Sequence, residues 1–539
     1  MKTPGVYIVE KSAFPNSVVE AATAIPAFIG ITEKAQNGPD SLAGKPWKIT
    51  SMTEYQQYFG GAPAPEFELS VTDSPDTNST DTFYSIESAF KGADGKGKLL
   101  KVVDKSGPFS LYYHMVMFFA NGGGTCYIVS VGIYDEKAPV DKDKVKNALE
   151  EMEKEQEITM VVVPEAASTA DCKDIQTQVL AHCGKMMNRF AILDVQPKAA
   201  ETEKMDDQIK TFRTNVGANF LSYGAAYYPW LNTSVLSDKD IDGTVLTWNF
   251  TEDAPDVALF FDAKSKFPKY FAEAYAEIAK GKKNELKEKT NADGVVETDE
   301  NKKPVMEMQE VPLTNDELAV MKNNLHNALL QNLPGYQYIV NKVKDKLNLL
   351  PPSAAMAGLY TMVDNTRGVW KAPANVSVNY VNSPQVTIDN AQQEDLNMPM
   401  NGKAVNAIRP FPGEGIKVWG ARTLDGNSQD WRYVNVRRTM LFLETSVKNA
   451  ARAYVFEPND ASTWINMKCM IENFLRSVWK RGGLAGATPE DAFEVHVGLG
   501  DTMTSDDILE GILRITVLVA ISRPAEFIEI TFQQQMQKS

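Results

Sequence analysis

Helical and strand patterns alternate regularly between residues 142 and 231, and this alternation limits the fold more than any other feature of the chain. Apolar residues recur at helical spacing over 142–155 and 171–188, and short apolar runs follow at 158–164 and 189–194. Such a series is typical of a mostly parallel sheet covered by helices. Because 539 residues exceed what one core normally organises, the sequence predicts a mixed α/β (α+β) protein with several domains.

Two features of this region invite a ligand-binding interpretation. A Gly-rich run, Asn121 to Gly124, follows a helical pattern and precedes a strand. Phosphate loops have the opposite order, so these glycines are expected to cap the helix C-terminus. Asp194 ends a strand, where open α/β sheets often place catalytic groups. Without a partnered base in its vicinity, we expect Asp194 to cap a helix or anchor a loop.

No motif of known chemistry stands out elsewhere. The phosphate-loop, zinc-protease, nucleophile-elbow and EF-hand patterns are absent, and four histidines leave little material for general-base or metal chemistry. The cysteines show no zinc-finger spacing and are expected to be buried free thiols: Cys126, Cys172, Cys183 and Cys469. We therefore expect no catalytic residue, no cofactor and no metal site.

Charge and hydropathy indicate which classes of partner the chain can bind and in which cell compartment it is made. A formal net charge of −15 disfavours a broad nucleic-acid surface. The N-terminus has no long apolar run, and no segment approaches the ~20 apolar residues of a membrane helix. We expect a chain made in the cytoplasm, with neither nucleic-acid binding nor direct membrane insertion.

Both ends of the chain have strand character. Val6, Tyr7, Ile8 and Val9 form a short alternating run, and a buried strand is expected over 23–32. At the other end, strands are expected over 493–499, 512–521 and 526–532. In the last of these, Ile528, Ile530 and Phe532 alternate with polar residues before a polar tail. Terminal strands of this kind can complete a neighbouring sheet.

Two stretches are expected to be loops. Residues 62–82 are too polar to bury, and the run 282–310 is dense in Lys, Glu, Asp and Asn, which predicts a solvated, mobile loop between helices 268–280 and 314–331.

A long amphipathic helix is expected over 461–481. Its predicted apolar face comprises Trp464, Ile465, Met467, Ile471, Phe474, Leu475 and Val478. Its basic flank comprises Lys468, Arg476, Lys480 and Arg481. This flank is either a solvated surface or a contact surface for another protein.

Short segments rich in Trp, Arg, Gly and Asn follow one another through the last third of the chain. They read PPSAAMAG (351–358), DNTRGVWKAPAN (364–375), NAIR (406–409), GIKVWGARTL (415–424), WRYVNVRR (431–438), YVFEPN (454–459), LAGATPEDAF (484–493) and RPAEF (523–527). This succession resembles the contractile tail sheath proteins of phage tails and related contractile injection systems.

The resemblance implies a structural subunit that polymerises helically around an inner tube and contracts to drive the tube through a target membrane. It implies an N-terminal arm and first inner strand at 1–30, an outer α/β domain at 31–234, an insertion at 235–350, and a C-terminal segment with its own arm at 351–539. Residues 1–30 and 351–539 would together form the inner, tube-facing domain. The arm residues Val6–Val9, Ile528, Ile530 and Phe532 would mesh with neighbouring subunits, and Lys468, Arg476, Lys480 and Arg481 would face the tube. Implied partners are further copies in stacked hexameric rings, the tube protein, and baseplate and terminator proteins. Assembly in the bacterial cytoplasm would precede incorporation into a virion or injection particle.

Two alternatives stay open at this point, namely another phage-type structural protein, such as a capsid or tail component, and an α/β enzyme with an unrecognised site. The sequence does not distinguish a phage from an injection particle, and it identifies neither the cargo nor the target cell.

Overall fold

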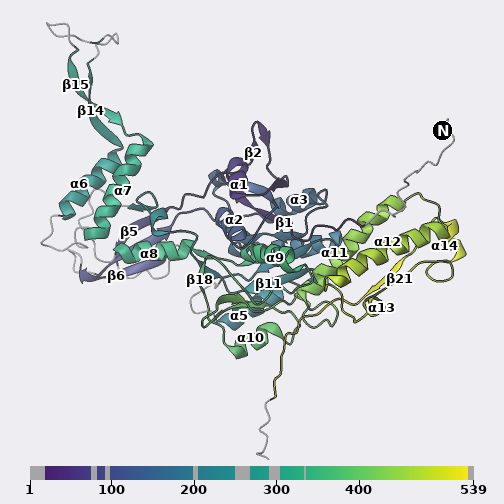
Figure 1. Ribbon diagram of the computed structural model, residues 1–539. Helices are drawn as coiled ribbons and strands as arrows, with labels where there is room; N and C mark the ends of the chain where they lie inside the picture. The colour runs from purple at the N-terminus through teal and green to yellow at the C-terminus, as the bar shows by residue number, and fades with distance from the viewer. Residues whose placement is uncertain are drawn as a thin grey trace, which may run out of the picture. The chain divides into compact units, whose positions relative to one another are not determined.

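The computed structural model describes residues 18–73, 82–91, 97–197, 204–248, 267–289, 296, 304–332 and 336–531. The chain divides into two compact units. Unit 1 comprises residues 1–62, 108–233 and 350–539, and unit 2 comprises residues 63–107 and 234–349. Figure 1 shows both units and labels many of their elements.

A nine-stranded sheet forms the centre of unit 1, in the order β17-β20-β19-β11-β10-β9-β1-β8-β4. Its strands are β1 (Pro26–Thr32), β4 (Trp47–Ile49), β8 (Cys126–Ile133), β9 (Met160–Val162), β10 (Phe190–Asp194), β11 (Gly224–Tyr228), β17 (Val376–Ser377), β19 (Asn406–Phe411) and β20 (Gly415–Val418). The strands from β8 to β19 are parallel, and β4, β20 and β17 are added antiparallel at the edges. Every residue of β1, β9, β10 and β11 is buried, as expected where helices cover both faces of a parallel sheet.

The helices of this layer match the alternation in the sequence. They are α1 (Met52–Phe59), α2 (Leu111–Ala120), α3 (Lys142–Met152), α4 (Cys172–Met186), α5 (Met205–Asn215), α9 (Ser353–Arg367) and α10 (Asn390–Asn397). Helices α2 and α9 pack on each other and on the central strands. A Cβ at Gly358 would lie 2.5 Å from the carbonyl oxygen of Phe118, so the close approach of α9 to α2 requires glycine there. The run from Asn121 to Gly124 ends α2, with the Gly123 amide bonded to the Phe118 carbonyl, so it is a helix cap as predicted.

The last part of unit 1 is helical, with one small sheet. Helices α11 (Val434–Ala451) and α12 (Ala461–Lys480) pack through Phe442, Phe474 and other apolar residues, and β21 (Phe493–His496) and β22 (Thr516–Val519) cover them together with α13 (Pro489–Ala492). Helix α14 (Ser505–Leu509) precedes β22. Ile465 was expected in the apolar face but is 61% exposed, because it lies about 200° around the helix from the buried Thr463 and Met467.

Unit 2 has a core of its own. A four-stranded sheet in the order β13-β5-β7-β6 comprises β5 (Phe67–Asp73), β6 (Thr82–Lys91), β7 (Gly97–Asp104) and β13 (Leu246–Trp248). Helices α6 (Phe267–Lys280), α7 (Asn315–Asn332) and α8 (Tyr336–Leu347) contribute Phe271, Leu329 and Ile339 to the apolar cluster that includes Phe67 and Leu69.

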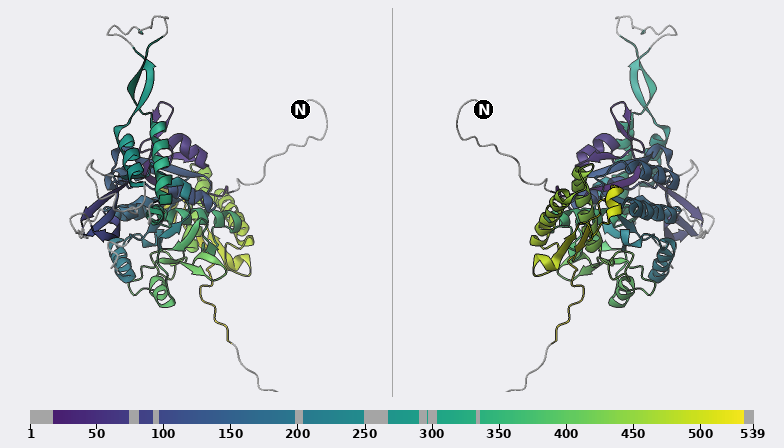
Figure 2. Two further views of the ribbon diagram at one scale, coloured as in Figure 1. Left: turned by 90° about the vertical axis from the view of Figure 1, so that its left-hand side faces the viewer. Right: turned by 90° about the vertical axis from the view of Figure 1, so that its right-hand side faces the viewer.

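Both loops predicted from polarity are wrong in part, since each contains strands. Residues 67–73 form β5, because two apolar residues at alternate positions, Phe67 and Leu69, suffice to bury one face. The charged run contains β14 (Lys282–Glu288) and β15 (Met306–Pro312), an antiparallel hairpin whose described side chains are exposed or half-buried. Backbone hydrogen bonds hold this ribbon together. At its base Lys283 pairs with Glu317 of α7, and Figure 2 shows the ribbon projecting away from the helices of unit 2.

The observed division of the chain also differs from the four segments expected. Strands β17, β19 and β20 come from the 351–539 segment, which was expected to form the inner domain together with residues 1–30, and they lie in one sheet with β1. That sheet also contains β8, β9, β10 and β11, from the segment expected to form a separate outer domain. Strand pairing across the sheet merges residues 31–62, 108–233 and 350–539 into one unit. The insertion expected at 235–350 corresponds closely to 234–349, but residues 63–107 belong with it.

Three other expectations concern the cysteines, membrane-spanning helices and metal-binding clusters. Cys126, Cys172 and Cys183 are buried free thiols as predicted, whereas Cys469 is exposed on α12. Within the described ranges, no helix combines the length and apolarity needed to cross a bilayer. The same residues contain no cluster of His, Cys, Asp and Glu suited to a metal ion.

Candidate functional site at the root of the C-terminal arm

Residues 522–531 have no helix or strand and leave the body of unit 1 as an extended segment, here named the C-terminal arm (Figures 1 and 2). The strand expected at 526–532 is therefore absent over 526–531. Phe527, Ile528 and Ile530 are 71%, 79% and 70% exposed. A strand needs a partner strand for its backbone groups, and within the described part of the chain no strand pairs with residues 526–531. Phe532 and the run Val6–Val9 lie outside the described residues.

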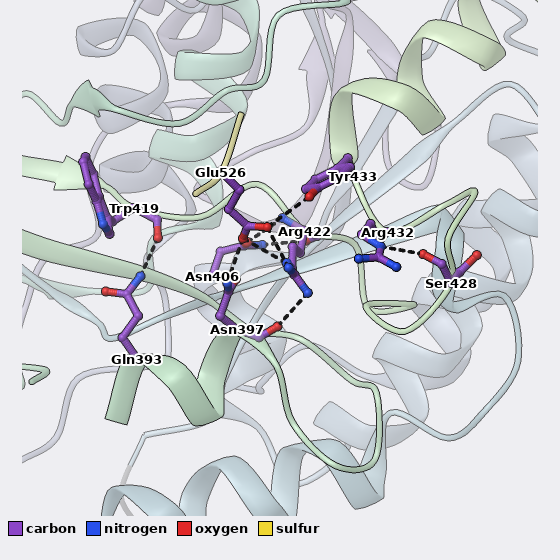
Figure 3. Close-up of polar contacts among 9 residues, drawn as sticks. All are labelled: Gln393, Asn397, Asn406, Trp419, Arg422, Ser428, Arg432, Tyr433 and Glu526. Atoms are coloured by element: carbon purple, nitrogen blue, oxygen red, sulfur yellow. Dashed lines mark hydrogen bonds and ion pairs between the residues drawn. The ribbon is translucent and has the colours of Figure 1, made fainter. Parts of the chain in front are cut away.

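Glu526 fastens the arm to the body by a clasp with Arg422 (Figure 3). Arg422 Nε and Nη2 donate to Glu526 Oε1 and Oε2 at 3.0 and 2.6 Å. Asn397 Nδ2 donates to Oε1 at 2.7 Å, and the Tyr433 hydroxyl donates to Oε2 at 3.1 Å. The Arg422 side chain is 3% exposed and that of Glu526 is 20% exposed. This bidentate, largely desolvated pair is the strong form of ion pair.

Asn406 holds the backbone of Arg422 through contacts that do not involve the arm. Asn406, in β19, accepts the Arg422 backbone N–H at 2.7 Å and donates to the Arg422 carbonyl oxygen at 2.8 Å. Burial raises the pKa of the Glu526 carboxyl, but hydrogen bonds from Arg422 and Asn397 and the charge of Arg422 outweigh it, so the pKa is lowered overall. The carboxylate is therefore ionised at neutral pH and the clasp is charged.

A second set of contacts holds residues 20–23, here named the N-terminal root. Arg438, on α11, donates from Nη1 and Nη2 to the two carboxylate oxygens of Asp364 at 2.9 and 2.7 Å, and from Nη2 to the Thr23 carbonyl at 2.9 Å. The Arg438 and Asp364 side chains are 4% and 1% exposed. The Ala21 amide donates to Ser446 Oγ at 2.9 Å. One buried cation thus joins α9, α11 and the chain entering β1.

The residues expected to face a tube separate into two groups. Lys468, Arg476 and Lys480 lie on one side of α12, and Lys468 makes a weak contact of 3.9 Å with Glu472. Arg481 instead binds both carboxylate oxygens of Glu20, and its guanidinium lies 5.2 Å from the Trp370 ring centre. The first three form a basic stripe, whereas Arg481 belongs to the N-terminal root.

Two buried carboxyls of unit 1 hold backbone together. Asp194 Oδ1 accepts the Ser353 amide at the start of α9 at 2.8 Å, so it anchors a helix start as expected. Glu165, which the sequence did not single out, accepts the amides of Ile31, Ser110 and Leu111 at 2.8, 2.7 and 3.0 Å. Burial raises the pKa of each carboxyl to about 7, against the opposing effect of these donors. These hydrogen bonds to backbone amides account for the burial of both carboxyls by a structural role, without a substrate.

Sequence reasoning singled out the segments of the clasp but not its pairing. Asn406, Arg422, Tyr433 and Glu526 all lie in the segments that carry the sheath resemblance. The only signal in the sequence was one acid in RPAEF (Glu526) and two bases in GIKVWGARTL (Lys417 and Arg422), and neither segment indicates that Glu526 meets Arg422.

The part of the chain that matches a known protein family includes the C-terminal arm and, from the clasp, Tyr433 and Glu526. A family model described as the phage tail sheath C-terminal domain matches residues 427–535. The tail sheath protein of Vibrio phage KVP40 is 25% identical over 174 residues, which is 32% of this chain and 25% of the phage protein. That of Salmonella phage ViI is 23% identical over 149 residues, covering 28% of this chain and 24% of the phage protein. The matched part is thus about a quarter of these relatives.

Solved structures match over nearly the whole chain. The sheath complex of the extracellular contractile injection system PVC, in its contracted state, has a TM-score of 0.55 and 25% identity, covering 99% of this chain and 98% of that one. The contracted helical sheath of the anti-feeding prophage AFP has a TM-score of 0.56 and 25% identity, covering 99% and 100%. The resemblance predicted from the sequence is confirmed: the chain has the fold of contractile sheath proteins and carries, at residues 427–535, the C-terminal domain of the phage tail sheath family.

Proposed function

We propose that this chain is the structural subunit of a contractile sheath, which polymerises helically around an inner tube and drives that tube through a target membrane when it contracts. The C-terminal arm carries the proposal, because its apolar side chains stand in water while a buried clasp holds its root. Apolar surface presented in this way is normally covered by a partner. Similar chains were solved as a sheath complex and a helical sheath, which supports another copy as that partner.

The sheet of β21 and β22 is the natural acceptor for a donated strand. It has two strands in the described part of the chain, paired from Phe493↔Val519 to His496↔Thr516. Two-stranded sheets are marginally stable, and their outer edges carry unpaired backbone groups. A neighbouring arm added at such an edge would gain the backbone bonds that it lacks alone.

The energies explain why the arm is extended in the single chain. A donated strand of about six residues makes roughly six backbone bonds worth ~0.5–1.5 kcal/mol net each. Ordering costs ~1–2 kcal/mol per residue, so one arm alone is close to neutral. Side-chain burial and many simultaneous contacts in a lattice make linkage stable.

In the proposed assembly, the N-terminal root and the Glu526–Arg422 clasp fix where each arm leaves unit 1, so each unit 1 moves as a rigid body. The arms keep neighbouring subunits connected, as contraction by subunit rotation requires. Copies arranged head to tail in stacked hexameric rings would form the helical array. The tube protein, the baseplate and a terminator are the further partners, and a similar chain in the AFP baseplate structure supports baseplate contact. Assembly would take place in the bacterial cytoplasm, before the sheath becomes part of a virion or injection particle.

Removing residues 527–539 while retaining Glu526 tests the arm. We expect a folded monomer with unchanged unfolding midpoint, because the clasp is intact, and no polymer, because the donated strand is gone. Negative-stain electron microscopy and sedimentation of the purified chain, alone and with its tube protein, measure polymer formation. Deletion of 533–539 alone serves as control and should leave polymerisation unchanged.

Removing residues 1–10 should have the same outcome as removal of the C-terminal arm. Normal-length cylinders from either arm truncation would contradict strand exchange. A wild-type chain that stays monomeric under both conditions would contradict the sheath function itself.

Charge reversal of the basic stripe, by Lys468→Glu, Arg476→Glu and Lys480→Glu together, should weaken attachment to the tube. Three cations on one helix side, of which Arg476 and Lys480 are exposed and Lys468 is half-buried, favour an acidic partner surface. We expect polymers that form but release the tube protein at lower salt than the wild type does, measured by co-sedimentation over an ionic-strength series.

The matched control reverses three exposed lysines elsewhere in unit 1, Lys146, Lys173 and Lys210, and changes net charge equally. Equal tube retention by both triple variants would exclude the stripe as the tube contact.

A further inference from the structure

Arg437 is a buried arginine that lacks an anionic partner. It lies in the first turn of α11 with 5% of its surface exposed, and no ion pair joins it to any described residue. Its Nε atom is buried and has no hydrogen-bond partner among those residues. Its neighbour Arg438, which is 4% exposed, instead binds both carboxylate oxygens of Asp364. Because a buried charge without a counter-charge is costly, Arg437 needs an explanation that Arg438 does not.

Two aromatic rings contact the guanidinium of Arg437. Its central carbon lies 3.8 Å from the ring centre of Tyr223 and 4.5 Å from that of Trp431. Such rings attract a cation through their faces but provide no strong acceptor for its N–H donors. The guanidinium is therefore held in place while hydrogen-bonding capacity along its edge stays available. A partner that binds it loses little conformational entropy, because the group is already positioned.

The surrounding protein balances this charge only in part. Burial lowers the pKa of Arg437, and the opposing charge effects of Tyr223 and Glu444 do not offset it. A hydrogen bond with Tyr223 has the smallest effect on this pKa. Glu444 lies seven residues further along α11 and forms no ion pair with Arg437. The start of α11 adds positive charge, because no side chain caps it. The site as a whole therefore favours an oxyanion.

The outer end of the guanidinium has access to solvent. Among its three nitrogens, only Nε is both unbonded and closed off from solvent. The small exposed area of Arg437 therefore includes the Nη atoms. Two N–H donors on one edge of a guanidinium match the two oxygens of a carboxylate.

We propose that Arg437 binds an acidic side chain of a second copy, whose carboxylate accepts hydrogen bonds from the Nη atoms when two subunits meet. This inference rests on the proposed sheath function and assigns one residue of unit 1 to a contact between copies. A second copy suits this role because the chain has 70 Asp and Glu residues against 55 Lys and Arg residues. Acidic chains that associate need cations placed opposite their carboxylates.

Arg437→Met separates this role from folding. Removing an unpaired buried charge should leave the Tm of the single chain equal to that of the wild type or higher, whereas Arg438→Met, which breaks a buried pair, should lower it. The critical concentration of Arg437→Met for polymerisation should rise at least about tenfold. Glu444→Gln is the matched control, because it removes an acid whose charge acts on Arg437 within the chain. That variant should polymerise like the wild type.

Inorganic phosphate tests the anion site without polymerisation. At matched ionic strength, phosphate in place of chloride should raise the Tm of the wild-type chain more than that of Arg437→Met, because an anion that binds the folded chain stabilises it. The variant measures the general effect of phosphate on stability.

Four outcomes would overturn the inference. A fall in Tm for Arg437→Met as large as that for Arg438→Met would show that stacking on the two rings is structural. Equal phosphate effects in the wild type and Arg437→Met would show that Arg437 binds no anion. Wild-type polymerisation by Arg437→Met, with or without loss of the tube protein, would exclude a contact between copies. Impaired polymerisation of Glu444→Gln would make Glu444 the partner of Arg437. A wild-type chain that responds to phosphate through Arg437 but never polymerises would instead refute the proposed function.

Discussion

Replacing Arg438 by Met is expected to destabilise unit 1 by about 3–5 kcal/mol, because it leaves a buried carboxylate without its partner. Asp364 would lose both charge-assisted bonds at 1% side-chain exposure, and the Thr23 carbonyl would lose its donor as well. The measurement is urea unfolding followed by tryptophan fluorescence. Loosening of the N-terminal root should accompany the loss, seen as faster amide exchange or proteolysis at residues 18–25.

Arg367→Met is the matched control, since Arg367 is an exposed arginine at the C-terminal end of α9, the helix that carries Asp364, and should cost less than about 1 kcal/mol. The double variant Arg438→Met with Asp364→Leu should recover much of the stability, because no buried charge stays unpaired. Equal losses for the single and double variants would show that packing of the Arg438 side chain, and not its charge, is what matters.

Glu165 and Asp194 should make unit 1 less stable as pH rises from 5 to 8. Burial raises the pKa of both carboxyls to about 7, above the ordinary values of 4.5 and 3.8. At pH values between the ordinary pKa and the raised pKa, each carboxyl is ionised in the unfolded chain but stays protonated in the folded chain. This ionisation lowers the free energy of the unfolded chain alone. Each group therefore contributes stability at low pH that is lost by neutral pH, by roughly 2–4 kcal/mol.

The test compares variants with the wild type, because burial also lowers the pKa of His114, His182 and His326, which acts in the opposite sense below pH 6.5. The stability of the wild type relative to Glu165→Gln should fall by about 2–3 kcal/mol between pH 5 and 8, and likewise for Asp194→Asn. Parallel stability curves for the wild type and either variant would mean that the corresponding carboxyl does not titrate in this range.

Local patterns predicted much of the fold because helices and buried strands leave a short-range signature. The alternation over 142–194 became α3, β9, α4 and β10 within a few residues, and the Gly-rich run capped α2. The same reasoning failed where polarity was taken for disorder: β5 needs only Phe67 and Leu69 to bury a face, and the hairpin of β14 and β15 buries almost nothing. In a strand that is solvated on both faces, hydropathy carries no signal.

The candidate site was predictable as a set of segments and not as a geometry. Arg422 meets Glu526 across 104 residues, and Arg438 meets the Thr23 carbonyl across 415. The entropy of closing such loops depends only weakly on their length, so sequence separation does not indicate which partners meet.

The sequence by itself determined the fold class and the resemblance to the sheath family, because these depend on residue periodicity and on the order of short segments. Tertiary structure alone decided that one sheet joins β1 and the C-terminal strands to β8, β9, β10 and β11 of the expected outer domain, and that two buried arginines fasten the roots of the chain ends. The physical reason is that burial and charge pairing are properties of positions in space, and distant segments acquire those positions only when the whole chain has folded.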